Sequence, residues 1–421
     1  MKVLILTYYF PPAGGSGVQR WLKFVKYLPQ FDVEPIVYTV KNPNYPLTDT
    51  SLLKEVSDEI TILKQPIFEP SNFLPLKKNK QSAGFLTKNP NFIQKIIHFI
   101  RANYFIPDAR KFWIKPSVKY LNNYIKEHNI KTVITTGPPH SVHLIGLKLK
   151  QQNNLKWIAD FRDPWTDIDY FHQLPLTKKA LKKHTELEAL VLKNADNVIV
   201  IGKTMQSNYL KFNENTHVIP NGFDTFNENE SVSLTKKFSL LHIGMLNSDR
   251  NHTMLWKVLS ELMTENRKFS DDLEIKLIGK ICTEAMDSIK QYNLSNKVTH
   301  IDYIKHQAVF AQQQAAQVLI LLINNVPSAK GIITGKIFEY LQAKRPILAI
   351  APNDGDLAEI IKNTNSGMVV SFNDEASLKK SILSLYESYK NNTLAVSSKN
   401  IEKYHRKSLT KTLAELLKQK N

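Results

Sequence analysis

Short runs of apolar, mostly β-branched residues recur along the chain, and segments with helical periodicity separate them. Each run has the length and composition of a buried strand. The strands expected in the first half are Val3–Leu6, Ile36–Val40, Val133–Thr136, Trp157–Phe161 and Val198–Ile201, and those in the second half are Leu240–Ile243, Ile275–Ile278, Val298–Ile301, Val318–Ile323, Ile347–Ile350 and Met368–Ser371. The helical segments between them include Val18–Leu28, Thr177–Lys193 and Thr334–Leu341. Strands that alternate with helices predict an α/β fold with parallel sheets covered on both faces.

The two series of strands indicate two domains. A chain of 421 residues also exceeds the size of roughly 250–300 residues at which one core stops growing. The break falls near Val218–Asp224, where Pro and then Asn-Gly form a turn signal. We therefore expect an N-terminal domain over residues 1–224 and a C-terminal domain over residues 225–399. A last helical segment, residues 400–421, either caps the second domain or crosses back to join the first.

Composition narrows the class of protein. The hydrophobic share of 42% and the charged share of 22% are ordinary for a globular chain. The single cysteine, Cys282, excludes an internal disulfide and a cysteine-based zinc site, and it suits a reducing cytosol. The run Val3–Leu6 is interpreted as a strand rather than a signal peptide, because no cleavage site follows it. No run of about 18 apolar residues predicts a membrane-spanning helix.

The formal net charge of +18 favours an anionic partner, although general solubility would also account for it. Residues Phe92–Arg101 interleave apolar residues with cations, and the basic stretch Leu76–Lys80 precedes them. This pattern predicts either an amphipathic helix on an anionic membrane surface or an ordinary core-facing helix. A nucleic acid is not expected as a partner, because the chain has no zinc-finger or RNP motif.

A glycine-rich turn follows the first expected strand and opens a helix. Gly14, Gly15 and Gly17 let the backbone approach a ligand, and the N–H groups at a helix start attract phosphate or sugar oxygens. Arg20 occupies the place of the third small residue of a dinucleotide motif, and no acidic residue ends Ile36–Val40. The turn therefore indicates an oxygen-rich ligand other than a dinucleotide.

A second candidate site lies where a loop opens the helical segment Thr334–Leu341. Lys336 and Glu339 are three residues apart and share a helical face. The cation can pair with a phosphate, and the carboxylate can accept hydrogen bonds from both hydroxyls of a ribose. The alternative is a surface ion pair, which would contribute little.

Two strand ends in the first half carry further candidates. His140 and Asp163 each follow an expected strand, and ligands of open α/β sheets bind at such ends. His140 would bind an acceptor or a sugar, or else cap the next helix. Asp160 and Asp163 would position an acceptor hydroxyl or accept its proton. Asp163 could instead cap a helix or pair with Arg162.

Several segments match, in order, the motifs of one enzyme family. They are Tyr8–Pro12, Gly14–Gly17, Val218–Asp224, His242–Gly244 with Arg250, and Lys336–Leu341 through Pro346. In these segments the chain resembles glycosyltransferase family 4, which has the GT-B architecture. Ile106–Asp108 with Trp113, and Asp160–Trp165, resemble a subgroup linked to bacterial surface polysaccharides.

The resemblance implies two Rossmann-like domains that face each other across a cleft, with the donor nucleotide on the second and the acceptor on the first. Arg250 and Lys336 would neutralise the donor diphosphate, Glu339 would hold the ribose, and the Gly14–Gly17 loop would lie under the pyrophosphate or the sugar. Such enzymes need no bound metal or other cofactor, because cations and helix dipoles stabilise the leaving group. Gly331 stands where the family often has a glutamate, which leaves the donor sugar open.

The expected function is therefore transfer of a hexosyl unit from a nucleotide-diphosphate sugar to a lipid-linked or polysaccharide acceptor, in cell-surface glycan biosynthesis. Retention of the anomeric configuration comes only from the resemblance. Two alternatives stay open, a nucleotide-sugar-binding protein with impaired catalysis and a nucleotide-sugar epimerase on the same architecture. We expect a cytoplasmic protein, with a peripheral position on the inner face of the plasma membrane as a further alternative.

Overall fold

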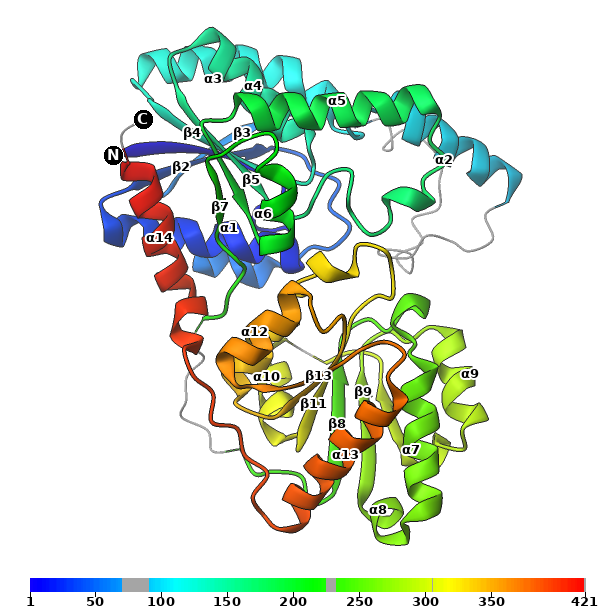
Figure 1. Cartoon of the computed structure of the whole chain (residues 1–421). Coiled ribbons are helices and arrows are strands. Elements are labelled where there is room, and N and C mark those ends of the chain that lie inside the picture. Colours follow the sequence, from blue (N-terminus) through cyan, green and yellow to red (C-terminus); the bar gives the residue numbers. More distant parts are fainter. Residues whose placement is uncertain (70–90, 225–231, 305, 420–421) are drawn as a thin grey trace. The chain divides into compact units, whose positions relative to one another are not determined.

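The structure, a computed structural model, describes residues 1–69, 91–224, 232–304 and 306–419 (Figure 1). Contacts within the chain divide it into two compact units. Unit 1 comprises Met1–Asn221 and Arg406–Asn421, and unit 2 comprises Gly222–His405. In the part of the chain that the structure describes, no helix has the length and apolar character needed to cross a bilayer.

Unit 1 is built on a parallel sheet with the strand order β3-β2-β1-β4-β5-β6-β7. Its strands are β1 (Lys2–Leu6), β2 (Glu34–Val40), β3 (Thr61–Gln65), β4 (Thr132–Gly137), β5 (Lys156–Phe161), β6 (Asn197–Val200) and β7 (Thr216–Val218). Leu4 in β1 is paired with Ile36 on one side and Val133 on the other. Because all these strands run the same way, their carboxyl ends share one edge of the sheet, and the loops there carry the candidate residues of unit 1.

Helices cover both faces of this sheet (Figure 1). The helices of unit 1 are α1 (Ser16–Tyr27), α2 (Phe92–Tyr104), α3 (Ile114–Glu127), α4 (Ser141–Gln152), α5 (Lys178–Asn194), α6 (Lys203–Tyr209) and α14 (Arg406–Lys418). The apolar sides of α1 and α14 pack on one face, where Trp21, Phe24 and Leu413 join strand residues such as Ile5 and Ile134 in one core. α3, α4 and α5 lie on the other face.

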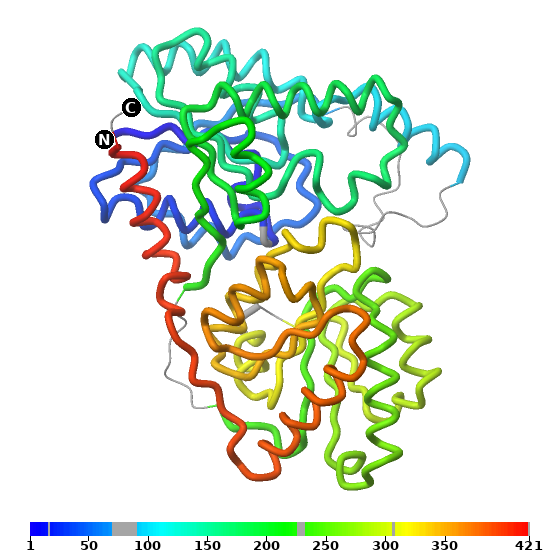
Figure 2. Tube along the Cα trace, in the orientation of Figure 1, coloured from blue at the N-terminus to red at the C-terminus, as the bar shows by residue number. Residues whose placement is uncertain are grey.

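The last helix therefore packs beside the first one, although most of the chain separates them in sequence. Figure 2 shows α14, in red, next to the blue N-terminal segment. Leu413 is fully buried there, and the Lys156 ammonium donates a hydrogen bond of 3.1 Å to the Leu416 carbonyl. The core of unit 1 is thus completed by residues from both ends of the chain.

Unit 2 repeats the scheme with the strand order β10-β9-β8-β11-β12-β13, all parallel. Its strands are β8 (Phe238–Ile243), β9 (Leu273–Ile278), β10 (Val298–Ile301), β11 (Val318–Leu322), β12 (Ile347–Ile350) and β13 (Gly367–Val370). Its helices are α7 (Thr253–Glu265), α8 (Arg267–Asp272), α9 (Thr283–Gln291), α10 (His306–Ala315), α11 (Lys336–Ala343), α12 (Asp356–Thr364) and α13 (Glu375–Lys390). Buried residues of α7, α9 and α13 form one core with the sheet. The expected α/β class is confirmed in both units.

Candidate functional site

In unit 2, the side chain of Lys336 passes over a glycine at the end of a strand. Gly335 precedes α11, so Lys336 is the first residue of that helix. Gly244 follows β8 with a φ of 110°, and a Cβ atom there would lie 2.6 Å from the Lys336 Cε atom. A side chain at position 244 would therefore displace the lysine. The glycine at this position of the motif therefore leaves room for the side chain of Lys336.

The Lys336 ammonium is enclosed without an ion-pair partner among the described residues. Burial and, to a smaller extent, the charge of Arg250 lower its pKa to about 7, while the charge of Glu339 opposes the shift. His242, in β8, is buried and neutral, because burial and the charge of Lys336 hold its pKa well below the ordinary value. Burial disfavours the charged form of this lysine, and a bound anion would stabilise it.

Arg250 is a second cation close to Lys336, and hydrogen bonds hold its guanidinium in place. The Arg250 Nε atom donates to Asn324 Oδ1 at 2.7 Å, and Nη1 donates to the Met245 carbonyl at 3.1 Å. Asn324 follows β11 and Met245 follows β8, so both anchors lie at the carboxyl ends of neighbouring strands. A guanidinium fixed in this way is preorganised for a phosphate.

Glu339 lies one turn beyond Lys336 on α11 and receives a hydrogen bond from α10. The Gln313 amide donates to Glu339 Oε2 at 3.1 Å. Gln313 itself is buried. This contact orients the carboxylate and leaves it acceptor capacity for hydroxyl groups. Sequence reasoning missed Gln313, because a glutamine inside a helix gives no signal of its partner.

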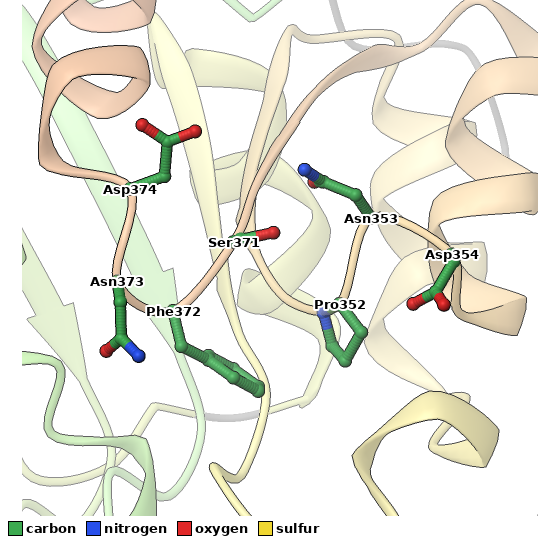
Figure 3. Close-up of a pocket in the computed structure, with 7 residues that line it drawn as sticks. All are labelled: Pro352, Asn353, Asp354, Ser371, Phe372, Asn373 and Asp374. Atoms are coloured by element: carbon green, nitrogen blue, oxygen red, sulfur yellow. The ribbon is translucent and has the colours of Figure 1, made fainter.

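A hollow in unit 2 lies between the loops that follow β12 and β13 (Figure 3). It is lined by Pro352, Asn353, Asp354, Ser371, Phe372, Asn373 and Asp374. Phe372 stacks on His252 with ring centroids 5.2 Å apart, and Asp374 Oδ1 accepts a hydrogen bond of 3.0 Å at the start of α13. None of the predicted donor-binding residues lines this hollow, so Arg250, Lys336 and Glu339 belong to a different part of unit 2.

In unit 1, the glycine-rich turn precedes α1. Gly15 has a φ of 91°, and a Cβ atom added there would meet no atom within 4 Å beyond its chain neighbours, so its outer side is open. Gly14 packs against Leu47, where a Cβ atom would lie 3.0 Å from Cγ. A Cβ atom on Gly17 would lie 2.7 Å from Arg162 Nη1, which donates to the Gly17 carbonyl. Gly17 is therefore needed to admit the guanidinium of Arg162.

Arg162 connects three loops at the carboxyl edge of the sheet. Its guanidinium donates to the carbonyls of Gly17 and Pro138, and its charge acts on Asp163. It thereby ties the turn before α1, the loop after β4 and the loop after β5 together. The sequence signal for this role is the cation between Asp160 and Asp163, from which the sequence predicts only a partner for Asp163.

Asp160 is a structural residue, which corrects its expected role at an acceptor hydroxyl. Its fully buried carboxylate pairs with Arg20 at 2.8 Å and accepts hydrogen bonds from Trp21 Nε1 at 2.7 Å and Thr136 Oγ1 at 2.9 Å. Burial opposes its ionisation, but Arg20 and these donors hold its pKa below the ordinary value. No acceptor capacity is left at the surface, because the side chain has no exposed area.

Asp163, in contrast, has no hydrogen-bond or ion-pair partner among the described residues. Burial raises its pKa, the charge of Arg162 opposes this, and Asp169 and Asp160 add to the increase. The backbone N–H of Trp165, two residues on, donates to Glu188 Oε1 at 3.3 Å, and the Trp165 indole donates to His184 Nδ1 at 3.0 Å. The loop is thus fixed by α5 while its carboxylate stays available.

His140 precedes α4 and stacks on Trp165, with ring centroids 4.5 Å apart and ring planes 4° apart. Within the described residues neither of its ring nitrogens has a hydrogen-bond partner. Burial and the neighbouring His143 hold its pKa well below the ordinary value, so the ring is neutral. It does not cap α4: Asp108 does, accepting from the Ser141 N–H at 2.8 Å.

The structure therefore gathers the candidates into two groups. Arg250, Lys336 and Glu339 form the cationic cluster of unit 2, defined by those three residues. The turn Gly14–Gly17, His140 and Asp163 lie at the carboxyl ends of β1, β4 and β5 in unit 1. Among the described residues, no group of three or more His, Cys, Asp or Glu side chains is placed to hold a metal ion.

Two family models match the chain. The model described as Glycosyltransferase Family 4 matches residues 17–226, and the model described as Glycosyl transferases group 1 matches residues 237–388. Together they take in every strand except β1 and every candidate residue except Gly14 and Gly15. The chain therefore belongs to the family 4 glycosyltransferases, as its motifs predicted. A search of curated protein sequences found no match.

Solved structures of glycosyltransferases share the whole fold. Sucrose-phosphate synthase from Thermosynechococcus elongatus aligns with a TM-score of 0.62 at 15% identity, covering 99% of this chain and 98% of that one. A TarM variant from S. aureus, in complex with fondaparinux, α-GlcNAc-glycerol and UDP, aligns at 0.60 and 13%, covering 99% and 100%. WaaG, a glycosyltransferase involved in lipopolysaccharide biosynthesis, aligns at 0.57 and 12%, also covering 99% and 100%. The architecture is GT-B.

Proposed function

We propose that this glycosyltransferase moves a hexosyl unit from a nucleotide-diphosphate sugar to a lipid-linked or polysaccharide acceptor in cell-surface glycan biosynthesis. The observation that carries the proposal is the cationic cluster of unit 2. It combines two cations suited to a diphosphate with a carboxylate suited to a ribose, at the carboxyl edge of a parallel sheet. Family membership supports the proposed retention of configuration.

The cationic cluster would act on the leaving group. Negative charge grows on the diphosphate as the bond to the anomeric carbon breaks, and fixed cations stabilise that charge without reorganising. Arg250 is fixed by Asn324 and Met245, and the side chain of Lys336 passes close to Gly244, which has no side chain to displace it. We propose that these two cations serve the reaction without a bound metal or other cofactor.

Asp163 is the residue of unit 1 that we propose to receive the proton of the acceptor hydroxyl. Its carboxylate is unpaired within the described residues, and burial raises its pKa, which makes it a stronger base than an ordinary aspartate. His140 is neutral and stacked on Trp165, so we propose that it contacts the acceptor or the sugar as a neutral hydrogen-bonding group. The open side of Gly15 would accommodate the pyrophosphate or the sugar.

The solved relatives support particular choices of donor and acceptor. The TarM complex contains UDP, which favours the uridine series as the first donors to test. WaaG is described as acting in lipopolysaccharide biosynthesis, which supports a cell-surface glycan as the product. The sugar itself is left to experiment, because Gly331 stands where the family often has a glutamate.

The proposal is tested by thermal-shift assays with uridine, guanosine, adenosine and thymidine diphosphate sugars, on the wild type and on Lys336→Ala. A ligand that binds the native form raises its apparent stability. We expect one nucleotide series to stabilise the wild type. Lys336→Ala should weaken that binding by about tenfold or more, since hydrogen bonds to charged groups contribute roughly 1.5–3 kcal/mol. Lys362→Ala, at an exposed position of α12, is the matched control.

The donor identified in this way is then used with Asp163→Asn in a transfer assay. We expect donor binding to stay unchanged and turnover to fall by about 10²–10⁴, the usual contribution of a general base. If no nucleotide sugar stabilises the wild type, the donor proposal is wrong. Conversion of the donor sugar without an acceptor would instead indicate an epimerase, and binding without turnover would indicate a nucleotide-sugar-binding protein.

A further inference from the structure

Helix α2 exposes nearly all of its large apolar side chains. No residue of this helix is buried. The exposed fractions are 77% for Phe92, 66% for Ile93, 44% for Ile96, 41% for Phe99, 44% for Ile100 and 66% for Tyr104. A helix of a globular protein normally turns such residues toward the core. Among the residues that the structure describes, none covers the apolar side of α2 in this way.

These apolar residues share one side of the helix. At 3.6 residues per turn they fall, with Ile97, within about half of the circumference, interrupted there by Asn103. The other half carries Gln94, Lys95, His98 and Arg101, so that Lys95 and Arg101 lie on opposite flanks of the apolar side. Apart from Asn103, this division is the pattern of a helix that lies in the interface of a bilayer.

The helix is nevertheless well formed and anchored. Asn91 and Gln94 make a reciprocal capping box at its start. At its other end, the Asn103 side chain donates to the Pro175 carbonyl at 2.8 Å and accepts from the Thr177 N–H at 2.7 Å. Figure 1 shows α2 at the margin of unit 1, near the end of α5 where these residues lie. The apolar side is therefore a fixed surface.

Cations lie on the two segments next to α2. The first two turns of α5 carry the exposed residues Lys178, Lys179, Lys182 and Lys183, and Leu181 between them is 46% exposed. After α2, the Lys111 ammonium donates to the Tyr104 carbonyl at 2.6 Å and lies 5.3 Å from the ring centre of Phe112, which is 42% exposed. The basic stretch Leu76–Lys80 lies outside the described residues.

We propose that α2 and the start of α5 dock on an anionic lipid bilayer, with α2 parallel to the membrane plane. Apolar side chains would enter the boundary between headgroups and acyl chains, and the flanking cations would contact anionic headgroups. The lysines next to the apolar side of α2 favour a lipid surface over a protein partner. Cores of protein interfaces are depleted of lysine, whereas a lysine-rich margin beside exposed phenylalanine and isoleucine matches a negative lipid surface.

The test is flotation of the full chain with vesicles of phosphatidylcholine alone, and with vesicles of equal parts phosphatidylcholine and phosphatidylglycerol. We expect binding to the anionic vesicles that weakens as salt rises. Ile93→Ser, Ile96→Ser and Phe99→Ser together should weaken it by more than about a hundredfold, because several buried apolar groups are lost. Lys95→Gln with Arg101→Gln should weaken it by about fivefold per cation.

The matched control is Leu53→Ser, Leu210→Ser and Met286→Ser together, which replaces three exposed apolar residues on other elements. It should bind as the wild type does. A polarity-sensitive fluorophore on Ile96→Cys, in a Cys282→Ser background, should report an apolar environment when anionic vesicles are added. This assay uses no donor or acceptor, so its result is independent of the proposed transferase activity.

Three outcomes would overturn the proposal. They are wild type that does not float with anionic vesicles, an apolar variant that floats as well as the wild type, and a wild-type oligomer that the apolar variant dissociates. The last result would show that a second copy of the chain covers α2. Circular dichroism of each variant checks that the fold is kept, which is expected because the substituted positions are exposed.

Discussion

Two aspartates in one short segment differ in almost every physical respect. Asp160 is the second-last residue of β5 and directs its carboxylate to Arg20 and Trp21 of α1. Asp163 lies three residues on, in the loop, and is left without a partner among the described residues. The sequence predicts both as polar residues at the end of a strand, and their spacing does not distinguish a structural role from a catalytic one. The long-range partner Arg20 decides the difference.

Asp160→Asn tests how much the buried network stabilises unit 1. The side chains of Arg20 and Asp160 are 3% and 0% exposed, so the substitution leaves a buried cation without its counter-charge. We expect a loss of about 3–5 kcal/mol in the free energy of unfolding. Urea denaturation of the full chain, followed by tryptophan fluorescence, measures it.

Glu186→Gln is the control for that measurement, because Glu186 pairs with Lys182 on α5 where both side chains are largely exposed. Its effect should stay below about 0.5 kcal/mol. An effect of Asp160→Asn as small as that of the control would contradict the structural role of the network.

The pH dependence of donor binding tests the environment of Lys336. Its pKa is lowered to about 7, so the free protein carries a charged lysine below that pH and a neutral one above it. Binding to a diphosphate needs the charged form. Affinity should therefore be highest below pH 7 and should fall by up to about tenfold per pH unit above it, with uptake of a proton on binding. Calorimetry in buffers of different ionisation enthalpy measures that uptake.

Lys336→Arg is the informative variant, because a guanidinium stays charged over the whole range. The affinity of this variant for the donor should change little between about pH 6 and 9, because its side chain stays charged throughout. The charged groups that act on Lys336 are Arg250 and Glu339. A wild-type profile as flat as that of Lys336→Arg would show that Lys336 is fully charged throughout.

At the scale of elements, the apolar runs predicted the inner strands of both sheets, and the structure confirms them within a few residues. The strands that the pattern missed, β3 (Thr61–Gln65) and β7 (Thr216–Val218), are at the two edges of the sheet in unit 1. β3 is only partly buried and β7 is three residues long. An edge strand with one neighbour needs no continuous apolar run, so hydrophobic patterning can miss it, although it did find β10 and β13 at the edges of the sheet in unit 2.

Helix α14 offers a test of how the ends of the chain cooperate. Leu413 is fully buried among Trp21, Phe24 and strand residues of unit 1. Leu413→Ala should destabilise unit 1 by about 2–5 kcal/mol, because it removes apolar contacts and leaves a cavity. Differential scanning calorimetry should show a lower transition temperature for unit 1.

Lys411→Ala, at an exposed position of the same helix, should leave that transition almost unchanged and serves as the control. The transition of unit 2 should not move in either variant. A Leu413→Ala protein that melts like the wild type would mean that α14 contributes little to the core of unit 1.

For the whole molecule, the sequence predicted the architecture better than it predicted the contacts within the candidate site. Alternation of strands and helices specified two α/β units, and ordered motifs specified the family. The pair of Lys336 and Glu339 also followed, since the two residues are local neighbours on one helix, whereas Arg250 came from the family resemblance. Gln313, Asn324 and Arg162 did not follow, because each acts through a contact with residues distant in sequence.

The return of α14 to unit 1 bears on how the protein is made. Until the ribosome has translated α14, unit 1 lacks Leu409, Leu413 and Leu417, which belong to its core. Unit 2, residues 222–405, is by then entirely synthesised and can complete its own core first. Unit 1, whose first strand is translated before any other element, therefore completes its core only after unit 2 has been synthesised.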